Sequence, residues 1–171
     1  MTKKKQTEIT KQERTKFLLS RSLMTGFIGG IVWSIVGTFM YYFNFAEVAP
    51  KTILLRSWTN AKWTNGWLGD VVSILIIGVI SILIAFIYYG LLKKVISMWM
   101  GVVYGLILWG IIFYILQPVF PTLTPVVDFD KETIVTTLGL FILYGTFIGY
   151  SISFDYNDMR IKEKKENQSQ N

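Results

Sequence analysis

Long stretches without any charge dominate this chain and alternate with short polar connections. Four long stretches contain no Asp, Glu, Lys or Arg, and the first three are residues 22–46, 71–92 and 95–127, which are 25, 22 and 33 residues long. An α-helix needs about 20 apolar residues to cross the roughly 30 Å of hydrocarbon in a bilayer. Only Lys93 and Lys94 separate the second stretch from the third. These two stretches therefore predict a transmembrane hairpin with a very tight turn.

Prolines and charges set the limits of the expected helices. Pro118, Pro121 and Pro125 are incompatible with a continuous helix, so the third span is expected to end near Gln117. A further apolar stretch, residues 133–154, predicts a fourth span. The fold class predicted is an all-α membrane protein with a four-transmembrane-helix bundle. Its transmembrane domain covers residues 22–154, with spans at residues 22–46, 71–92, 95–117 and 133–154.

The two ends of the chain are polar. Residues 1–21 form a basic segment, and the uncharged stretch that follows is too long for the core of a signal peptide, so it is interpreted as a retained first span. Residues 155–171 form a charged tail rich in Gln and Asn. Because this tail has too few apolar residues to fold alone, it is predicted to be disordered.

Polar residues mark the expected starts of two helices. Asn65 is expected to cap the second span, with Gly66 and Gly69 allowing a tight entry. Asp70 would then lie in the first helical turn, where a carboxylate complements the helix dipole. Asp130 is expected to cap the fourth span in the same way.

The distribution of basic residues predicts an orientation. Four spans place the N-terminus, the Lys93–Lys94 turn and the tail on one side, which then holds 13 of the 17 Lys and Arg residues. Cytoplasmic flanks of membrane proteins carry such an excess, so both termini are expected to be cytoplasmic. A basic margin next to lipid also explains the net charge of +6, and nucleic acid is not an expected partner.

The composition excludes most catalytic chemistry. The chain contains no cysteine and no histidine, which excludes disulfides and cysteine zinc sites and removes the commonest general base. Within the predicted spans no residue other than tyrosine is ionisable, whereas ion-coupled transport generally needs buried carboxylates, histidines or arginines. We therefore expect no enzymatic activity, no metal site and no cofactor.

Small residues at four-residue spacing form ridges on three of the predicted spans. Such ridges let helix backbones approach closely in lipid, although glycine is also simply frequent in membrane helices. The second span is weaker in this respect, so spans one, three and four are expected to make the tight contacts and span two to be more exposed to lipid. The candidate helix-packing residues are Gly26, Gly30, Ser34, Gly101, Gly105, Gly145 and Gly149.

The two outer connections supply the candidates for an exposed site. Trp58, Trp63 and Trp67 lie in the first connection, and since indoles prefer the headgroup zone it is interpreted as a segment lying on the membrane interface. The alternative is a cap over an opening between the helices. The second connection carries Asp128 and Asp130, which could bind a divalent cation or share a proton. Helix capping and solvation explain these two carboxylates at least as well.

The chain resembles the YqhR family of small membrane proteins from Bacillus-type bacteria. The resemblance rests on four stretches that cover roughly residues 20 to 158: MTGFIGGIVWSIVGTFMYYFNFAEVAP, TNGWLGDVVSILIIGVIS, LLKKVISMWMGVVYGLILWG and LYGTFIGYSISFDYN. It implies a bacterial plasma-membrane protein with four spans. The family has no assigned activity, so the resemblance implies no catalytic residue.

A fainter similarity links the chain to the YagU family of inner-membrane proteins. It rests on residues 27–29 with residues 47–50, and on residues 99–101 with residues 123–125. This similarity implies a shared scaffold and a role in envelope or acid-stress physiology. The chain departs from that family in having no histidine.

Three functions are compatible with these patterns. The favoured one is a non-enzymatic scaffold or accessory subunit in the lipid bilayer, which associates through its Gly-rich helix faces with another membrane protein or with itself. The second is a channel or carrier for a small neutral or lipid-like solute, with a polar cavity lined by Thr38, Asn44, Ser73, Ser81, Gln117 and Tyr144. The third is a membrane enzyme that acts on lipid through the outer carboxylates.

Overall fold

The chain folds almost entirely into helices. The computed structural model describes residues 3–59, 61–95 and 97–169, so the outermost ends of the predicted terminal segments and residue 96 of the predicted third span lie outside the described residues. The long helices are α1 (Lys3–Tyr42), α2 (Trp67–Leu92), α3 (Met98–Gly110) and α4 (Lys131–Ser169). The short ones are the π-helices η1 (Thr52–Arg56) and η3 (Ile111–Ile115) and the 3₁₀-helices η2 (Lys62–Asn65), η4 (Gln117–Val119) and η5 (Val126–Asp128).

Four helical segments in the described part of the chain are long and apolar enough to cross a membrane. The all-α prediction is confirmed for these residues, which contain no strand. The third segment continues α3 through the π-helix η3 and stops before Pro118, as the prolines predict. The four segments are Glu13–Tyr42, Trp67–Leu92, Met98–Ile115 and Lys131–Lys162.

Helix α1 ends earlier than its uncharged stretch predicts. The helix stops at Tyr42 because Asn44 adopts the left-handed conformation, with φ of 59°. The N–H of Asn44 donates to the Tyr41 carbonyl (3.1 Å) and the N–H of Phe45 donates to the Met40 carbonyl (2.9 Å). These two bonds form a Schellman motif, which satisfies the last carbonyls of the helix. The predicted first span of residues 22–46 therefore extends about one turn too far at this end.

The start of α2 differs from the predicted cap. The N-cap residue is Gly66, whereas the Asn65 side chain accepts hydrogen bonds from Arg56 Nε (2.8 Å) and Nη2 (2.6 Å). Gly69 lies so close to the backbone of Thr64 that a Cβ atom would be 2.7 Å from the Thr64 carbonyl carbon. The prediction that Asn65 caps the helix is wrong, because the asparagine is used to hold Arg56 instead.

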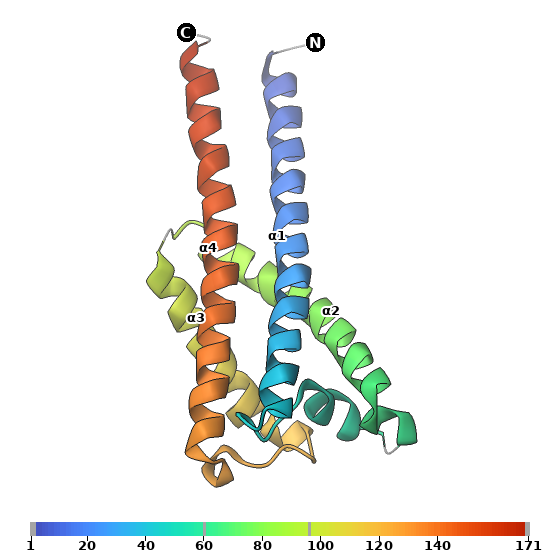
Figure 1. Ribbon diagram of the computed structural model, residues 1–171. Coiled ribbons are helices and arrows are strands. Elements are labelled where there is room, and N and C mark those ends of the chain that lie inside the picture. The colour runs from blue at the N-terminus through green and yellow to red at the C-terminus, as the bar shows by residue number, and fades with distance from the viewer. Residues whose placement is uncertain (1–2, 60, 96, 170–171) are drawn as a thin grey trace.

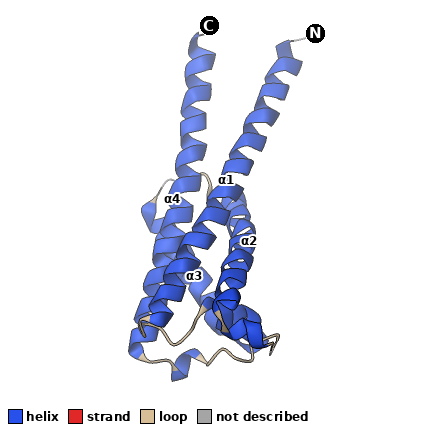
Figure 2. Cartoon of the chain, turned by 45° about the vertical axis from the view of Figure 1, so that its right-hand side comes forward, coloured by secondary structure: helices blue, strands red, loops and turns tan. Residues whose placement is uncertain are grey.

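Both polar ends of the chain continue the helices. Figures 1 and 2 show α1 and α4 both continuing past the turn between α2 and α3, with both termini at the same end of the molecule, and in Figure 2 the two helices diverge beyond that turn. Residues 155–169, which composition predicts to be disordered, form the last turns of α4. They contain neither Gly nor Pro, and Asp158 pairs with Lys162 one turn later at 2.7 Å. We call residues 3–20 of α1 and 156–169 of α4 the stalk.

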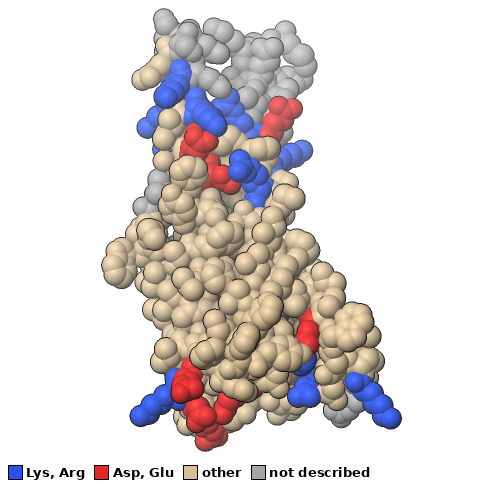
Figure 3. Space-filling view, viewed as in Figure 1, with Lys and Arg blue, Asp and Glu red and all other residues tan. Residues whose placement is uncertain are grey.

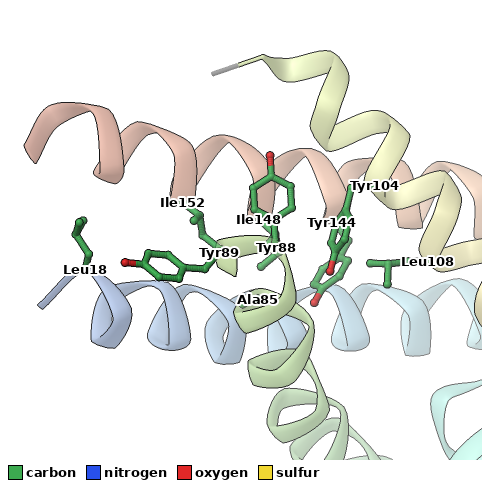
Figure 4. Packing of buried hydrophobic residues seen from close by; sticks show 9 residues of the cluster. All are labelled: Leu18, Ala85, Tyr88, Tyr89, Tyr104, Leu108, Tyr144, Ile148 and Ile152. Carbon is green, nitrogen blue, oxygen red and sulfur yellow. The ribbon is translucent and has the colours of Figure 1, made fainter. Parts of the chain in front are cut away.

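The buried core lies where the four helices meet. Helix α1 packs against α2 and α4, and α3 packs against α4. Tyrosines fill much of this core, and Tyr88 meets Tyr104 edge-to-face with ring centroids 4.9 Å apart (Figure 4). A smaller aromatic cluster at the loop end centres on Phe113, which is 3% exposed and packs against Phe129 and Phe141.

Close backbone approach holds two pairs of helices together. A Cβ atom on Gly145 of α4 would lie 2.5 Å from both the Gly101 carbonyl oxygen and the Gly105 Cα of α3. On α1, a Cβ atom on Gly26 would lie 2.5 Å from the Cβ of Ala85 in α2. A Cβ atom on Gly30 would collide with Ser81 of α2. The expectation that the second span makes the weaker contacts is therefore wrong, because serine and alanine on α2 receive the glycines of α1.

Two other candidate packing residues, Gly105 and Gly149, lie in the contact between α3 and α4. A Cβ atom on Gly105 would meet the Phe141 carbonyl, and one on Gly149 would lie 2.9 Å from both Gly101 Cα and the Tyr88 hydroxyl. Ser34 is buried on α1, and its hydroxyl has no hydrogen-bond partner among the described residues.

Charged side chains gather at the two ends of the molecule. Figure 3 shows them on the stalk and at the opposite end, with a broad uncharged belt between. Large apolar side chains are exposed along this belt, among them Leu83 (63%) and Val135 (70%). Exposed leucine and valine at this density are typical of surfaces that face lipid.

Candidate functional site at the loop face

The end of the molecule opposite the stalk contains a buried ion pair. We call this end, formed by residues 43–66 and 116–130, the loop face. Lys51 is 4% exposed and Asp70, in the first turn of α2, is 8% exposed. Lys51 Nζ lies 3.0 Å from both carboxylate oxygens of Asp70 and donates a hydrogen bond to Oδ2. The two buried charges compensate each other.

Tyrosines at the end of α1 complete this site. The Tyr42 hydroxyl donates to Asp70 Oδ2 (2.7 Å) and accepts a hydrogen bond from Lys51 Nζ (3.1 Å). The ammonium also lies 5.1 Å from the centre of the Tyr42 ring and 5.9 Å from that of Tyr41, within the range of cation–π attraction. Three elements, namely α1, the first connection and α2, are thereby joined through one polar cluster.

The hydrogen bonds keep the lysine charged despite its burial. Burial works to lower the pKa of the Lys51 ammonium, but the hydrogen bonds to Tyr42 and Asp70 and the nearby carboxylate outweigh it. The pKa of Lys51 therefore lies above its ordinary value of 10.5. A lysine with a raised pKa stabilises the fold fully below its unfolded pKa, and loses this effect only as the pH rises through the higher folded value. The ion pair is thus fully present at neutral pH.

A hollow with two carboxylates lies beside the ion pair. Its volume is about 550 Å³, and Glu47 of the first connection and Asp130 of the second both face it. The N–H of Glu47 donates to the Thr133 hydroxyl (3.0 Å) in the first turn of α4, which fixes the first connection against the start of α4. The complete lining consists of Tyr41, Tyr42, Asn44, Ala46, Glu47 and Asp130.

The proximity of these carboxylates changes the protonation of Glu47. A hydrogen bond to Asp130, followed by lost hydration and by the negative charge of Asp130, raises the pKa of the Glu47 carboxyl above its ordinary value of 4.5. The Glu47 carboxyl therefore keeps its proton to a higher pH than an isolated glutamate does. Among the described residues no three His, Cys, Asp or Glu side chains come together in a way that could hold a metal ion.

The raised pKa of Glu47 predicts a pH dependence of stability. A carboxyl group whose pKa is raised in the folded state favours folding below its unfolded pKa, and this contribution is lost as the pH rises through the folded value. The apparent melting temperature in detergent should therefore fall slightly as the pH rises from the ordinary glutamate pKa of 4.5 through the higher folded value. Glu47→Gln, which resembles the protonated acid, should flatten this dependence.

A charge-matched variant provides the control for this prediction. Glu132→Gln removes the same charge from the first turn of α4 but leaves Glu47 and Asp130 facing each other. It should retain the decline. An equally flat profile for both variants would show that general acidity, rather than this pair, causes the effect.

The remaining candidates on the loop face are exposed. Trp58, Trp63 and Trp67 are all exposed, which favours the interface interpretation over a cap packed across an opening. Asp128 ends the short helix η5 and is exposed, whereas Asp130 lines the hollow. The structure thus brings Asp130 to Glu47 and leaves Asp128 apart.

The polar residues proposed to line a cavity use their hydrogen bonds in separate places. Ser81 on α2 donates to the Gly26 carbonyl of α1 (2.6 Å) and is hydrogen-bonded to the Tyr144 hydroxyl of α4. Thr38 and Ser73 bond to carbonyls of their own helices, at Ser34 (2.9 Å) and Asp70 (2.9 Å) respectively. Gln117 donates to the Leu123 carbonyl (3.1 Å), and Asn44 lies in the hollow at the end of α1. Among these side chains Ser81 and Tyr144 therefore tie helices together, whereas Thr38 and Ser73 bond within their own helices.

Comparison with known proteins decides the family. Residues 2–168 match the family model described as conserved membrane protein YqhR. The chain belongs to the YqhR family. A member from Bacillus subtilis (strain 168), described as uncharacterized protein YqhR, is 43% identical over 164 residues, which cover 93% of this chain and 92% of that protein. No solved structure matches the chain.

Membership of the YqhR family agrees with four apolar helices and states no activity. The resemblance proposed from the sequence is thereby confirmed, and the chain is a member of a conserved membrane protein family. The buried Lys51–Asp70 pair is the feature of the loop face that sequence reasoning missed. One signal for it was present, because Asp70 stands at the edge of a long uncharged stretch and a lysine lies in the preceding connection.

Proposed function

We propose that this YqhR-family protein is a non-enzymatic, multi-pass protein of the bacterial plasma membrane that acts as a scaffold or accessory subunit. In this proposal both termini are cytoplasmic, because the stalk, Arg21 at its base and the α2–α3 turn together carry 13 of the 17 basic residues. The partner is a second membrane-associated protein or another copy of the chain. The observation that carries the proposal is the stalk, which extends two helices beyond the turn between α2 and α3 (Figure 1).

The base of the stalk is held in a defined geometry. Arg21 on α1 pairs with Asp155 on α4 at 3.2 Å. Lys93 from the α2–α3 turn lies 4.0 Å from the Tyr89 ring centre and 5.6 Å from that of Tyr156. Beyond these contacts Phe17 (55%) and Ile161 (44%) are exposed among charged neighbours. Exposed apolar side chains on two polar helices offer a surface that a protein partner can bury.

The glycine-rich faces of the helices, unlike the stalk, are covered by other helices of the same protein. Gly26 and Gly30 are covered by α2, and Gly101 and Gly145 are covered by each other's helices. Because these faces hold the protein's own helices together, they are not free to bind a partner, and association through them is corrected to association through the stalk. The channel hypothesis receives less support, since Ser81 and Tyr144 close on each other inside the packed helices.

Site-specific photo-crosslinking in intact cells tests the proposal. A photo-reactive amino acid in place of Ile161, on the exposed side of the stalk, is expected to yield one protein adduct of defined mass. The same amino acid in place of Val135, which is 70% exposed in the apolar part of the same helix, should yield lipid adducts. Mass spectrometry of the adduct then distinguishes a second copy of the chain from another protein.

The proposal requires one partner to contact both helices of the stalk. Ile161 and Phe17 should be captured by the same partner, because they lie on the two helices of one stalk. Monomer alone at both positions, with Val135 still crosslinking to lipid, would contradict a scaffold role for the stalk.

A further inference from the structure

The first connection of the loop face has a composition that suits an anionic partner. We call residues 51–67 the arm. It contains Lys51, Arg56 and Lys62 but no Asp or Glu. Since Lys51 is neutralised by Asp70, the charge that the arm presents outward comes from Arg56 and Lys62.

The arm is amphipathic in three dimensions. Its inner side packs on the protein, where Leu55 is 8% exposed, Thr64 is 1% exposed and Ile53 packs against the aromatic cluster around Phe113. Its outer side carries three tryptophans whose exposed fractions are 69%, 44% and 71%, at Trp58, Trp63 and Trp67. Indoles and cations on the outer side of an apolar-backed segment are typical of elements that bind a membrane interface.

Internal hydrogen bonds hold the arm in this shape. Two nitrogens of the Arg56 guanidinium donate hydrogen bonds to the Asn65 side chain, which joins the two halves of the arm. Thr122 of the second connection donates to the Thr52 carbonyl (2.8 Å) and is hydrogen-bonded to Ser57 (2.7 Å). Because these bonds hold the described residues of the arm in place, its indoles and cations lose little conformational entropy when they bind.

The depth of the arm is set by α2. Trp67 is both the last residue of the arm and the first residue of the apolar segment Trp67–Leu92. The arm therefore lies where the hydrocarbon of the bilayer ends, which is the zone that tryptophan prefers. Phospholipid phosphates occupy the same depth and are within reach of side chains there.

We propose that the arm binds the headgroups of anionic phospholipids. In this arrangement the three indoles lie among the headgroups and upper acyl chains, while Lys62 and Arg56 attract the extra negative charge of the lipid. The buried Lys51–Asp70 pair fixes the arm to α2 at the required depth. Lipid is the favoured occupant over a protein because both the indole exposure and the depth of Trp67 match a membrane interface.

Fluorescence quenching in lipid nanodiscs tests this proposal locally. The chain has no cysteine, so Thr59→Cys gives one labelling site for an NBD fluorophore in the arm. The labelled protein is placed in phosphatidylcholine nanodiscs that contain a small, equal fraction of either nitroxide-labelled phosphatidylglycerol or nitroxide-labelled phosphatidylcholine. Quenching by the anionic lipid should correspond to a several-fold higher local concentration, roughly 5-fold for each cation near the headgroups.

Matched variants assign the selectivity to the arm. Lys62→Gln should lower the preference for phosphatidylglycerol by about 5-fold. Lys131→Gln removes an exposed cation from the start of α4 at the same face and should leave the preference unchanged. Because Arg56 also holds Asn65, Arg56→Gln is interpreted only if the NBD emission without quencher matches that of the parent protein.

Two outcomes would overturn the proposal. Equal quenching by both lipids in the parent protein would show an interfacial arm without headgroup selection. Absence of quenching by either lipid would show that the arm is away from lipid, as it would be under a protein partner or a second copy of the chain. Neither outcome bears on the stalk, so the proposed function and the lipid site are separable.

Discussion

Gly145→Ala is expected to destabilise the protein by roughly 2 kcal/mol, and Gly145→Leu by more than about 3 kcal/mol. The added Cβ would lie 2.5 Å from the Gly101 carbonyl oxygen and from Gly105 Cα, which are backbone atoms that no rotamer change can move. Helices α3 and α4 must separate by about 1 Å to restore ordinary contact, and the dispersion energy along the whole interface is lost with them. Unfolding in a denaturing detergent series measures the difference.

The same helix provides the control. A Cβ atom on Gly139 meets nothing within 4 Å, so Gly139→Ala should be neutral or raise stability by about 0.5–1 kcal/mol through helix propensity. Gly78→Leu on α2 should destabilise the protein more than Gly139→Ala and less than Gly145→Leu. The nearest neighbours of a Cβ atom on Gly78 are the flexible side chains of Phe27 and Ile31, at 3.0–3.1 Å. If Gly145→Ala and Gly139→Ala have equal stability, close backbone contact between α3 and α4 is not what holds these helices.

The glycine contacts also show how far sequence patterns can predict helix packing. Glycine spacing identified Gly101 and Gly145 correctly as positions of close approach. A helix face without side chains allows the backbone of a neighbouring helix to come into contact with it. Glycine spacing failed for the second span, where Ser81 and Ala85 are the residues that receive Gly26. Two helices can approach closely when one of them carries glycines and the other carries small side chains such as serine or alanine.

Helix ends were harder to predict than helix interiors. Hydropathy located the four apolar segments, since crossing a bilayer requires length and composition alone. It could not place the end of α1 at Tyr42, which depends on Asn44 adopting a left-handed conformation. It also gave no reason for helix in residues 155–169, where intrinsic propensity and the Asp158–Lys162 pair matter more than burial.

The loop face was the least predictable part of the molecule. Lys51 and Asp70 are 19 residues apart and meet only because the arm folds back upon itself. Each residue had a satisfactory explanation alone, as a solvated lysine and as a carboxylate at a helix N-terminus. Pairing across an irregular connection depends on its three-dimensional course, which periodicity does not report.

Removing one partner of this buried ion pair is expected to cost about 3–5 kcal/mol of stability. Asp70→Leu leaves the ammonium of Lys51 with the Tyr42 hydroxyl as its one hydrogen-bond acceptor among the described residues, in a site where Lys51 is 4% exposed. Lys51→Met leaves the Asp70 carboxylate with the Tyr42 hydroxyl and no compensating positive charge. Each variant should unfold at a lower denaturant concentration than the parent protein, measured near neutral pH where Lys51 is charged.

The double variant distinguishes the effect of the charge pairing from the effect of the volume that the two side chains fill. Lys51→Met with Asp70→Leu removes both charges together and replaces them with apolar side chains of similar size, so it should recover most of the loss. Tyr42→Phe removes hydrogen bonds to both charges but leaves them paired, and should cost about 1.5–3 kcal/mol. If the double variant instead loses the sum of the two single changes, the charges act independently and do not lock the arm. A coupling of several kcal/mol would mean that the position of the arm, and hence the depth of its tryptophans, is set by one buried pair between the first connection and α2.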